Sequence, residues 1–216
     1  MLISLAVDYR HANVATRERF HLSDARIAKL YAREPNSAIR ELVCVSTCNR
    51  SEIYAWAGGA DPASPAGYDH AISALAKAWM GSKTEARALL AVAKKRGGLD
   101  VARRLLRIAA GLDSQVMGDG QILGQLREAY RKADDTGSAS SVLHRLFDTA
   151  MRTGKRVSSE TGLHAGRRSV GAEAAAHAHQ RFGNLAHARV VVIGSGKTGQ
   201  SVARQLQKLG ARDIVL

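Results

Sequence analysis

Cysteine and long apolar runs are scarce in this sequence of 216 residues. Its two cysteines are too few for a disulfide framework, which excludes the class of small disulfide-stapled secreted domains. No run approaches the ~20 apolar residues of a membrane-spanning helix. The apolar start, Met1–Val7, has no basic region before it and no small-residue cleavage site after it. We therefore expect a protein of the reducing cytoplasm with no membrane partner.

Acidic residues are also few. There are 19 Asp and Glu against 32 Lys and Arg, which gives a formal net charge of +13, and most of the excess lies after residue 100. Such a balance favours a polyanionic partner such as nucleic acid, although a solvated basic surface gives the same count. Aromatic residues make up only 5% of the chain, which argues against a base-stacking platform for single strands.

The most informative stretch is Val45–Tyr54, in which two apolar strand-like runs flank a cluster of small polar residues. This pattern predicts a strand, a short turn and a second strand, with Cys48 at the turn. A thiol in a polar turn is accessible, and Arg50 can lower its pKa or bind an anionic group by paired hydrogen bonds. Cys48 can equally be a small buried filler, as most free cysteines are, but its neighbours Thr47 and Asn49 count against burial.

A glycine-rich loop at Gly111–Gly120 forms the second informative stretch and leads into a helix that starts near Gly120. Backbone N–H groups at a helix start favour an anion or a carbonyl oxygen. The spacing places four polar side chains around this helix start: Ser114, Asp119, Gln121 and Gln125. A plain loop capped by Asp119 is the alternative.

The first 139 residues predict an α+β fold in which helices cover a small sheet. Strands are expected at Leu2–Val7, Glu41–Ser46 and Ser51–Trp56, and Leu89–Ala93 fits either a strand or a helix. Helices are expected at Arg17–Phe20, Ser23–Arg33 with Ser23 as N-cap, Tyr68–Met80, and Val101–Ala110 with Asp100 as N-cap.

Two further helices, Ser140–Ser159 and Val170–Phe182, precede a strand at Val190–Ile193, a glycine loop, a helix at Ser201–Leu209 and a strand at Asp213–Leu216. This order predicts the first βαβ unit of a Rossmann-like α/β domain. The residues expected to bind a dinucleotide are Gly194, Ser195, Gly196, Lys197, Thr198 and Gly199. A P-loop is excluded, because Val191 occupies the position at which a P-loop has its first glycine.

The stretches Thr47–Tyr54, Gly111–Ser114, Gln121–Gln125 and Leu143–Glu160 together resemble glutamyl-tRNA reductase, and the resemblance covers essentially the whole chain. It implies a catalytic, substrate-binding domain over residues 1–139 and a connecting helical segment over residues 140–168. The start of an NADPH-binding Rossmann-like domain would follow over residues 169–216. No metal site is expected, since Cys44 and Cys48 lack further ligands.

The resemblance implies the reduction of glutamyl-tRNA by NADPH to glutamate-1-semialdehyde in tetrapyrrole biosynthesis. Cys48 would form a thioester with the glutamyl group, and Arg50 would bind its side-chain carboxylate. The amino acid would be held by Thr47, Asn49, Ser114, Asp119, Gly120, Gln121 and Gln125. Basic residues such as Arg152, Lys155 and Arg156 would face the tRNA backbone, although a solvated helix face is the alternative for each of them. A downstream aminomutase is an expected partner, and the family's homodimer uses a helical domain that this sequence lacks.

The chain departs from the family pattern at several positions near this site. Arg104 stands where the family has a histidine that assists proton transfer; an arginine cannot act as a base, so we expect Arg104 to stabilise an oxyanion. Gly120 replaces a proline. Because the sequence stops at Leu216, we expect poor NADPH binding by this chain alone. A divergent relative that binds, deacylates or transfers another aminoacyl group from tRNA without reduction is the alternative function.

Overall fold

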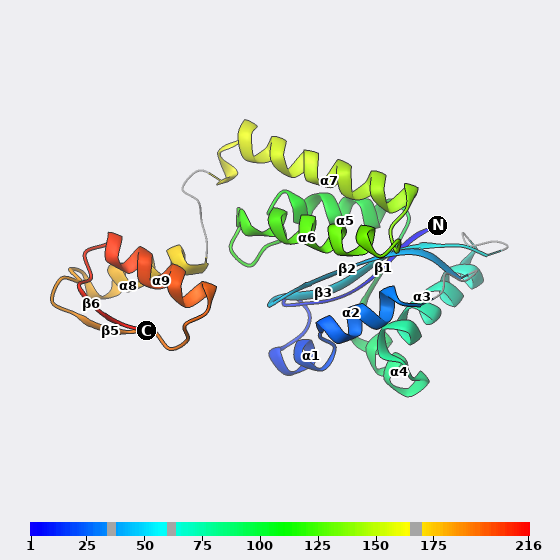
Figure 1. Ribbon diagram of the computed structural model, residues 1–216, viewed down its shortest axis with the longest axis horizontal. Coiled ribbons are helices and arrows are strands. Elements are labelled where there is room, and N and C mark those ends of the chain that lie inside the picture. The colour runs from blue at the N-terminus through cyan, green and yellow to red at the C-terminus, as the bar shows by residue number, and fades with distance from the viewer. Residues whose placement is uncertain (34–37, 60–63, 165–169) are drawn as a thin grey trace.

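A four-stranded antiparallel sheet runs through the N-terminal part of the chain in the computed structural model (Figure 1). The structure describes residues 1–33, 38–59, 64–164 and 170–216. The strand order is β2-β3-β1-β4, and every neighbouring pair is antiparallel. The strands are β1 (Leu2–Asp8), β2 (Ile39–Thr47), β3 (Arg50–Ala57) and β4 (Lys94–Gly97).

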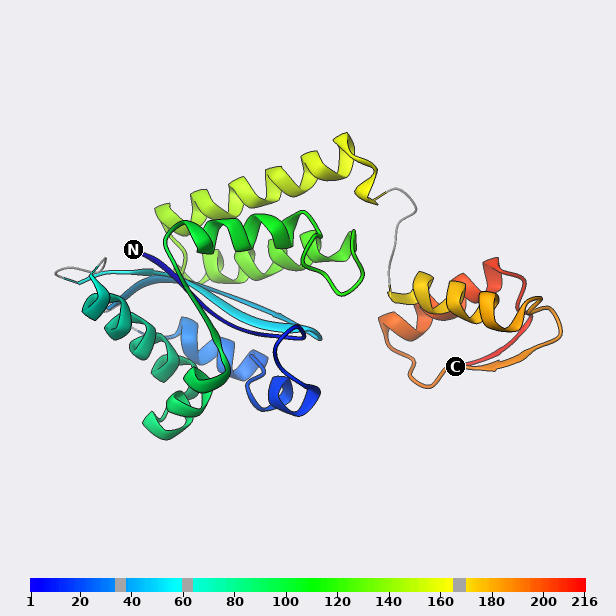
Figure 2. The same cartoon turned by 180° about the vertical axis from the view of Figure 1, so that it is seen from behind.

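Helices cover both faces of this sheet, as the front and back views show (Figures 1 and 2). One face carries α5 (Leu99–Ala109), α6 (Gln121–Asp135) and α7 (Ser141–Glu160). The other side holds α1 (Val14–Arg19), α2 (Asp24–Tyr31), α3 (Pro65–Met80) and α4 (Lys83–Val92). Because both faces are covered, Ile3, Leu5 and Val7 and the residues between them are all fully buried. The prediction of an α+β fold with a small, helix-covered sheet is confirmed.

A carboxylate from the sheet caps the N-terminus of α7. Glu41 of β2 is buried, and its two carboxylate oxygens accept hydrogen bonds from the backbone N–H groups of Ser140, Val142 and Leu143 at 2.8–3.3 Å. These N–H groups have no partner inside the helix, and the negative charge lies at the positive end of the helix dipole. Glu41 therefore fixes the start of α7 over the sheet.

The same helix packs closely on α5 at Gly154. A Cβ atom at this position would lie 2.5 Å from the carbonyl oxygen of Ala109 and 2.8 Å from a methyl group of Leu123, so only glycine allows this approach. At 20 residues, α7 is the longest helix of the described chain. Neither α7 nor any other helix within the described ranges has the length and apolar character that crossing a membrane requires.

The C-terminal part has its own small core, formed by Ala175, Leu185, Leu206 and Ala211. Its elements are α8 (Val170–Phe182), β5 (Arg189–Val191), α9 (Lys197–Lys208) and β6 (Asp213–Val215), preceded by a 3₁₀ turn at Gly162–His164. The two strands pair in parallel, with α9 as the connection between them. The predicted order of strand, glycine loop, helix and strand is therefore present.

Several details differ from the sequence-based expectation. Leu89–Ala93, which fitted either a strand or a helix, lies almost wholly in α4, and the strand follows it as β4. Asp100 does not cap α5; it lies in the first turn and pairs with Arg103, while Gly98 occupies the N-cap. Helix α1 begins at Val14, and Asn13 caps it, since its side-chain oxygen accepts a hydrogen bond from the N–H of Thr16. The expected domain boundary between residues 168 and 169 lies outside the described residues.

Candidate functional site

The turn between β2 and β3 consists of two residues, Cys48 and Asn49. Thr47 pairs with Arg50 across the turn, and the N–H of Asn49 donates a hydrogen bond to the Thr47 hydroxyl at 3.2 Å. The Asn49 carbonyl accepts a hydrogen bond from the N–H of Tyr9 at 3.0 Å, which ties the turn to the end of β1. Cys48 is exposed at the tip, which excludes the alternative of a small buried filler, whereas Cys44 is buried in β2.

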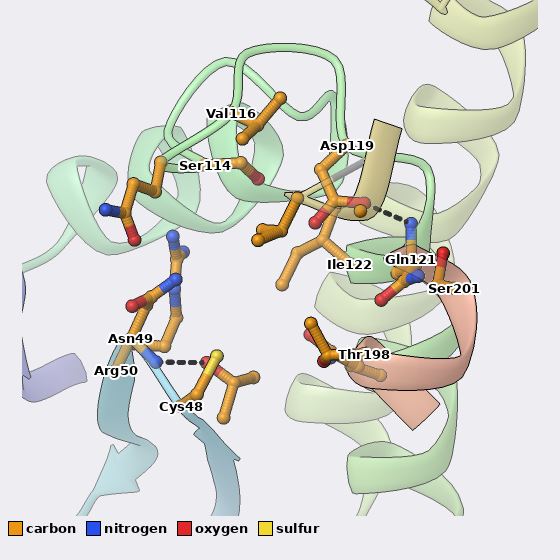
Figure 3. A pocket seen from close by; sticks show the side chains of 15 residues that line it. Cys48, Asn49, Arg50, Ser114, Val116, Asp119, Gln121, Ile122, Thr198 and Ser201 are labelled. Atoms are coloured by element: carbon orange, nitrogen blue, oxygen red, sulfur yellow. Dashed lines mark hydrogen bonds between the residues drawn. The ribbon is translucent and has the colours of Figure 1, made fainter. Parts of the chain in front are cut away.

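Cys48 borders a pocket of about 80 Å³, which we call the Cys48 pocket (Figure 3). Its wall combines the hairpin turn, the loop after α5, the start of α6 and the C-terminal part of the chain. Figure 3 shows Asp119 and Ile122 across from the turn and Thr198 and Ser201 to one side. The lining residues are Thr47, Cys48, Asn49, Arg50, Ser114, Gln115, Val116, Asp119, Gln121, Ile122, Gln125, Val170, Gly171, Thr198 and Ser201.

A second recess, the α1 groove, reaches Cys48 from the other side of the turn. It has a volume of about 470 Å³ and is lined by Val14, Arg17, Glu18, His21, Thr47, Cys48, Arg50 and Ser51. The thiol therefore borders two recesses, and a large substrate can approach it without entering the core.

The two thiols differ in chemical environment. Burial raises the pKa of the Cys44 thiol to about 12, against smaller opposing effects of Tyr31 and Arg33. A buried thiol of this kind stays protonated and unreactive at neutral pH. The exposed Cys48 is the one thiol of the described chain that a substrate can reach.

Arg50 lies beside the thiol at the start of β3 and is buried. Its Nη2 donates a hydrogen bond to the backbone carbonyl of Asp113 at 2.5 Å. Its Nη1 is 3.9 Å from Glu52 Oε1, beyond hydrogen-bond range, and finds no hydrogen-bond partner among the described residues. A buried guanidinium with an unused donor at a pocket wall is suited to an anionic ligand.

The loop between α5 and α6 places the remaining polar groups. The Ser114 carbonyl accepts a hydrogen bond from the Tyr9 hydroxyl at 3.1 Å, and Asp119 Oδ1 accepts one from the N–H of Gln121 at 2.9 Å. Gly118 has a φ of 81°, and a Cβ atom there would lie 2.3 Å from the carbonyl oxygen of Leu163. The loop is therefore held at both ends, and its path requires glycine at position 118.

Arg104 is not where the sequence suggested. Its guanidinium is buried among three carboxylates: Nη2 lies 2.5 Å from Asp8 and 2.6 Å from Glu52, and Nη1 lies 2.8 Å from Asp113. It lines neither the Cys48 pocket nor the α1 groove. The expectation that Arg104 stabilises an oxyanion is therefore corrected, because its donors are already occupied beneath the turn.

Most other predicted substrate residues lie together in the Cys48 pocket: Thr47, Asn49, Arg50, Ser114, Asp119, Gln121 and Gln125. Gly120 does not line it; this glycine is the N-cap of α6, with ordinary helical dihedral angles. Of the other predicted dinucleotide-binding residues, Thr198 lines the pocket, whereas Gly194, Ser195, Gly196 and Gly199 are not among its described lining residues.

Several lining residues were not foreseen: Gln115, Val116, Ile122, Val170, Gly171 and Ser201. Ser201 follows Thr198 by three residues on α9, so the shared helix face was a usable signal. Val170 and Gly171 begin α8, and nothing in their local sequence marks them.

The glycine loop before α9 has the local geometry of a tight strand-to-helix turn. Gly194 has a φ of 114°, and a Cβ atom on Gly199 would lie 1.9 Å from the carbonyl oxygen of Gly194. Both positions therefore require glycine. Gly196 is the N-cap of α9, and open space surrounds the position of its absent Cβ.

Comparison with known proteins identifies a family. A family model described as "Glutamyl-tRNAGlu reductase, N-terminal domain" matches residues 5–161. The glutamyl-tRNA reductase of Geobacillus kaustophilus is 35% identical over 217 residues, covering 100% of this chain and 46% of that protein. The enzyme of Rubrobacter xylanophilus is 37% identical over 216 residues, covering 99% of this chain and 48% of that protein.

Among solved structures, glutamyl-tRNA reductase from Methanopyrus kandleri matches with a TM-score of 0.61 and 28% sequence identity. The match covers 99% of this chain and 48% of that one. The chain thus spans about half the length of the curated relatives it matches.

Proposed function

The chain belongs to the glutamyl-tRNA reductase family, whose N-terminal domain it contains, and from this premise we propose that Cys48 accepts a glutamyl group from glutamyl-tRNA. The observation that carries the proposal is the exposed thiol at a two-residue turn, beside a buried arginine with an unused donor. The whole protein would then reduce the acyl group to glutamate-1-semialdehyde for tetrapyrrole biosynthesis.

The chemical step at Cys48 is transfer of the glutamyl group from an oxygen ester to the thiol, which forms a thioester. The Cys48 sulfur loses its proton and attacks the carbonyl carbon that joins the glutamyl group to the tRNA 3′ end. An S–C bond forms, the C–O bond to the ribose breaks, and the ribose oxygen takes up a proton. The reaction divides one difficult reduction into acyl transfer followed by reduction of a more reactive thioester.

Arg50 would recognise the side-chain carboxylate of the glutamyl group. Its buried Nη1 has no hydrogen-bond partner among the described residues, and Arg50 lines the same pocket as Cys48. A charge-assisted hydrogen bond there both fixes the substrate and compensates the burial of the guanidinium. The amino-acid backbone would contact Thr47, Asn49, Ser114, Asp119, Gln121 and Gln125, of which the Asp119 carboxylate suits the ammonium group.

The glycine loop of the C-terminal part fits a dinucleotide. Glycine at positions 194 and 199 allows the tight turn and the close approach of α9, and the space around Gly196 at the N-terminus of α9 leaves room for a pyrophosphate to approach the backbone. When bound, NADPH supplies the hydride that converts a thioester into an aldehyde. The residues that would hold it are Gly194, Ser195, Gly196, Thr198 and Gly199, with Lys197 as the adjacent cation.

The tRNA would meet basic side chains of the surface. On α7, Arg152 pairs with Asp148 at 3.1 Å and Arg156 pairs with Glu160 at 3.1 Å, so part of the positive charge expected to face tRNA is already neutralised. We assign only a general electrostatic contribution to this helix. Dimerisation and transfer of the product to an aminomutase stay predictions.

A divergent relative that transfers the acyl group to water or an amine is the second candidate. Arg104 in place of a histidine favours it, because its donors are occupied and it offers no proton-transfer group at this position. A reductase and a transferase share the Cys48 thioester and differ only in how the thioester is consumed.

Intact-protein mass spectrometry after brief incubation with glutamyl-tRNA tests the shared step. We expect a glutamyl adduct that neutral hydroxylamine removes, as it does a thioester. The adduct should be absent from Cys48→Ser and present in Cys44→Ser, the matched control with the buried thiol removed. A hydroxylamine-sensitive adduct on Cys48→Ser, or none on the unaltered chain, contradicts the proposal.

A further inference from the structure

Beneath the hairpin turn lies a cluster of five buried charged side chains, which we call the turn cluster. It consists of the carboxylates of Asp8, Glu52 and Asp113 and the guanidinium groups of Arg50 and Arg104, all at most 5% exposed. The carboxylates thus outnumber the buried cations. Arg10 and Arg107, which are 40% and 56% exposed at the side chain, add positive charge at the rim, and both bind Asp113.

Within the turn cluster, Arg104 and Arg50 compete for Glu52. Arg104 holds Glu52 Oε1 at 2.6 Å, whereas Arg50 Nη1 is 3.9 Å from the same oxygen. The second oxygen of Glu52 accepts a hydrogen bond from the Tyr54 hydroxyl at 2.7 Å. Glu52 is therefore satisfied without Arg50, and the Nη1 of Arg50 is left with no hydrogen-bond partner among the described residues.

We propose that Arg104 is a positioning residue that keeps Arg50 available to an anion beside Cys48 by occupying Glu52 and Asp8. The identity of the anion, a glutamyl side chain, rests on the proposed function, but the availability of Arg50 does not. With an uncharged side chain at position 104, Glu52 turns to Arg50 Nη1, and the cation at the pocket wall is neutralised from below.

Two further observations support this role. Although burial acts to lower the pKa of Arg104, the charges of Glu52 and Asp8 raise it above its ordinary value, so the side chain stays cationic at every working pH. The rim arginines cannot replace it, because the side chains of Arg10 and Arg107 contact the turn cluster at Asp113, not at Glu52.

The test compares the alkylation of Cys48 by iodoacetate, an anion, with alkylation by the neutral iodoacetamide. The ratio of the two rates reports the free positive charge beside the sulfur and cancels differences in thiol exposure. We expect Arg104→Met to lower this ratio by about tenfold, the effect of one lost charge-assisted hydrogen bond. Arg103→Met on the same helix, an exposed residue paired with Asp100, is the control and should leave the ratio unchanged.

A matched pair of double variants keeps the test decisive if Arg104→Met does not fold. Glu52→Gln with Arg104→Met and Asp8→Asn with Arg104→Met each remove one positive and one negative charge. The first double variant neutralises Glu52, the carboxylate that would otherwise pair with Arg50. It should therefore retain the ratio of alkylation rates of the unaltered chain. The second leaves Glu52 charged and should show the tenfold loss. Equal ratios in the two double variants overturn the proposal.

This assay uses no tRNA, so it separates the inference from the proposed function. If glutamyl-tRNA gives no adduct while the alkylation ratios behave as expected, the proposed function fails and the role of Arg104 stands. If an adduct forms and the ratio is insensitive to Arg104, the proposed function stands and the role of Arg104 fails. Peptide mapping assigns each alkylation to Cys48 rather than Cys44.

Discussion

Replacing Asp113 by asparagine removes the charge that holds the loop carrying Ser114. The Asp113 carboxylate is buried and accepts hydrogen bonds from Arg10 at 2.8 Å, from Arg104 at 2.8 Å and from Arg107 at 2.9 and 3.2 Å. Asparagine keeps the size of the side chain but presents one amide N–H₂ to three guanidinium groups. The perturbation is therefore electrostatic rather than steric.

The loss of unfolding free energy caused by Asp113→Asn can be estimated in two ways. Removing one partner of a buried ion pair costs about 3–5 kcal/mol, but Arg10 and Arg107 are partly exposed and regain water, which reduces the loss. The pKa of Asp113 offers the second route. Burial acts to raise it, but Arg10 and Arg107 lower it from 3.8 to about 2. A shift of this size corresponds to roughly 2 kcal/mol of stability at neutral pH. We expect a loss of about 2–3 kcal/mol.

The sign of the pH dependence follows from the lowered pKa. A carboxylate that is more acidic in the folded state stabilises it fully above the unfolded pKa of 3.8, and this contribution is lost as the pH falls from there towards 2. The difference in unfolding free energy between the unaltered chain and Asp113→Asn should therefore be constant from pH 5 to 7 and shrink below about pH 4.

Urea unfolding followed by tryptophan fluorescence measures this difference. Both tryptophans, Trp56 and Trp79, belong to the N-terminal part, so the signal reports the unit that contains Asp113. Asp100→Asn, which removes an exposed carboxylate paired with Arg103, is the control and should cost less than about 0.5 kcal/mol. A loss for Asp113→Asn no larger than that of the control, or one that persists unchanged below pH 4, would show that the Asp113 carboxylate does not stabilise the fold through its charge.

Other substitutions test the packing and the thiols. Gly154→Ala should destabilise the N-terminal part by about 1–3 kcal/mol in the same urea assay, because its Cβ would meet the carbonyl oxygen of Ala109; no loss would contradict the close approach of α7 and α5. Glu41→Gln should cost about 1–3 kcal/mol through the cap of α7, and hydrogen exchange should rise first at the start of that helix. A disulfide reagent should find one fast thiol in the folded chain, Cys48, roughly a hundredfold faster than Cys44; two equally fast thiols would argue against the buried position of Cys44.

The exposed thiol was predictable because its cause is local. Small polar residues between two apolar, strand-like runs indicate a tight turn, and Val45–Tyr54 shows that pattern over ten residues. The same holds for the caps at Ser23 and the glycines of the loop before α9, whose conformations depend on neighbours in sequence. The turn, the Ser23 cap and the glycine loop between strand and helix agree with the sequence-based expectation, whereas the binding of a dinucleotide by these glycines stays a prediction.

The position of Arg104 was not predictable, because its partners Asp8, Glu52 and Asp113 come from three distant segments that only the folded sheet brings together. The strand β4 was missed for another reason. Its sequence, Lys94–Gly97, is basic rather than apolar, as suits an exposed edge strand that must avoid pairing with other chains. Periodicity alone could not reveal it.

The central claim is that Cys48 and Arg50 together accept an acyl group that carries a carboxylate. The most direct test is the rate at which glutamyl-tRNA and glutaminyl-tRNA each acylate Cys48, measured by mass spectrometry on the unaltered chain and on Arg50→Met. We expect at least about a tenfold preference for the glutamyl group that disappears in Arg50→Met, since one charge-assisted hydrogen bond is lost. Equal rates on the unaltered chain, or a preference that survives Arg50→Met, would contradict it.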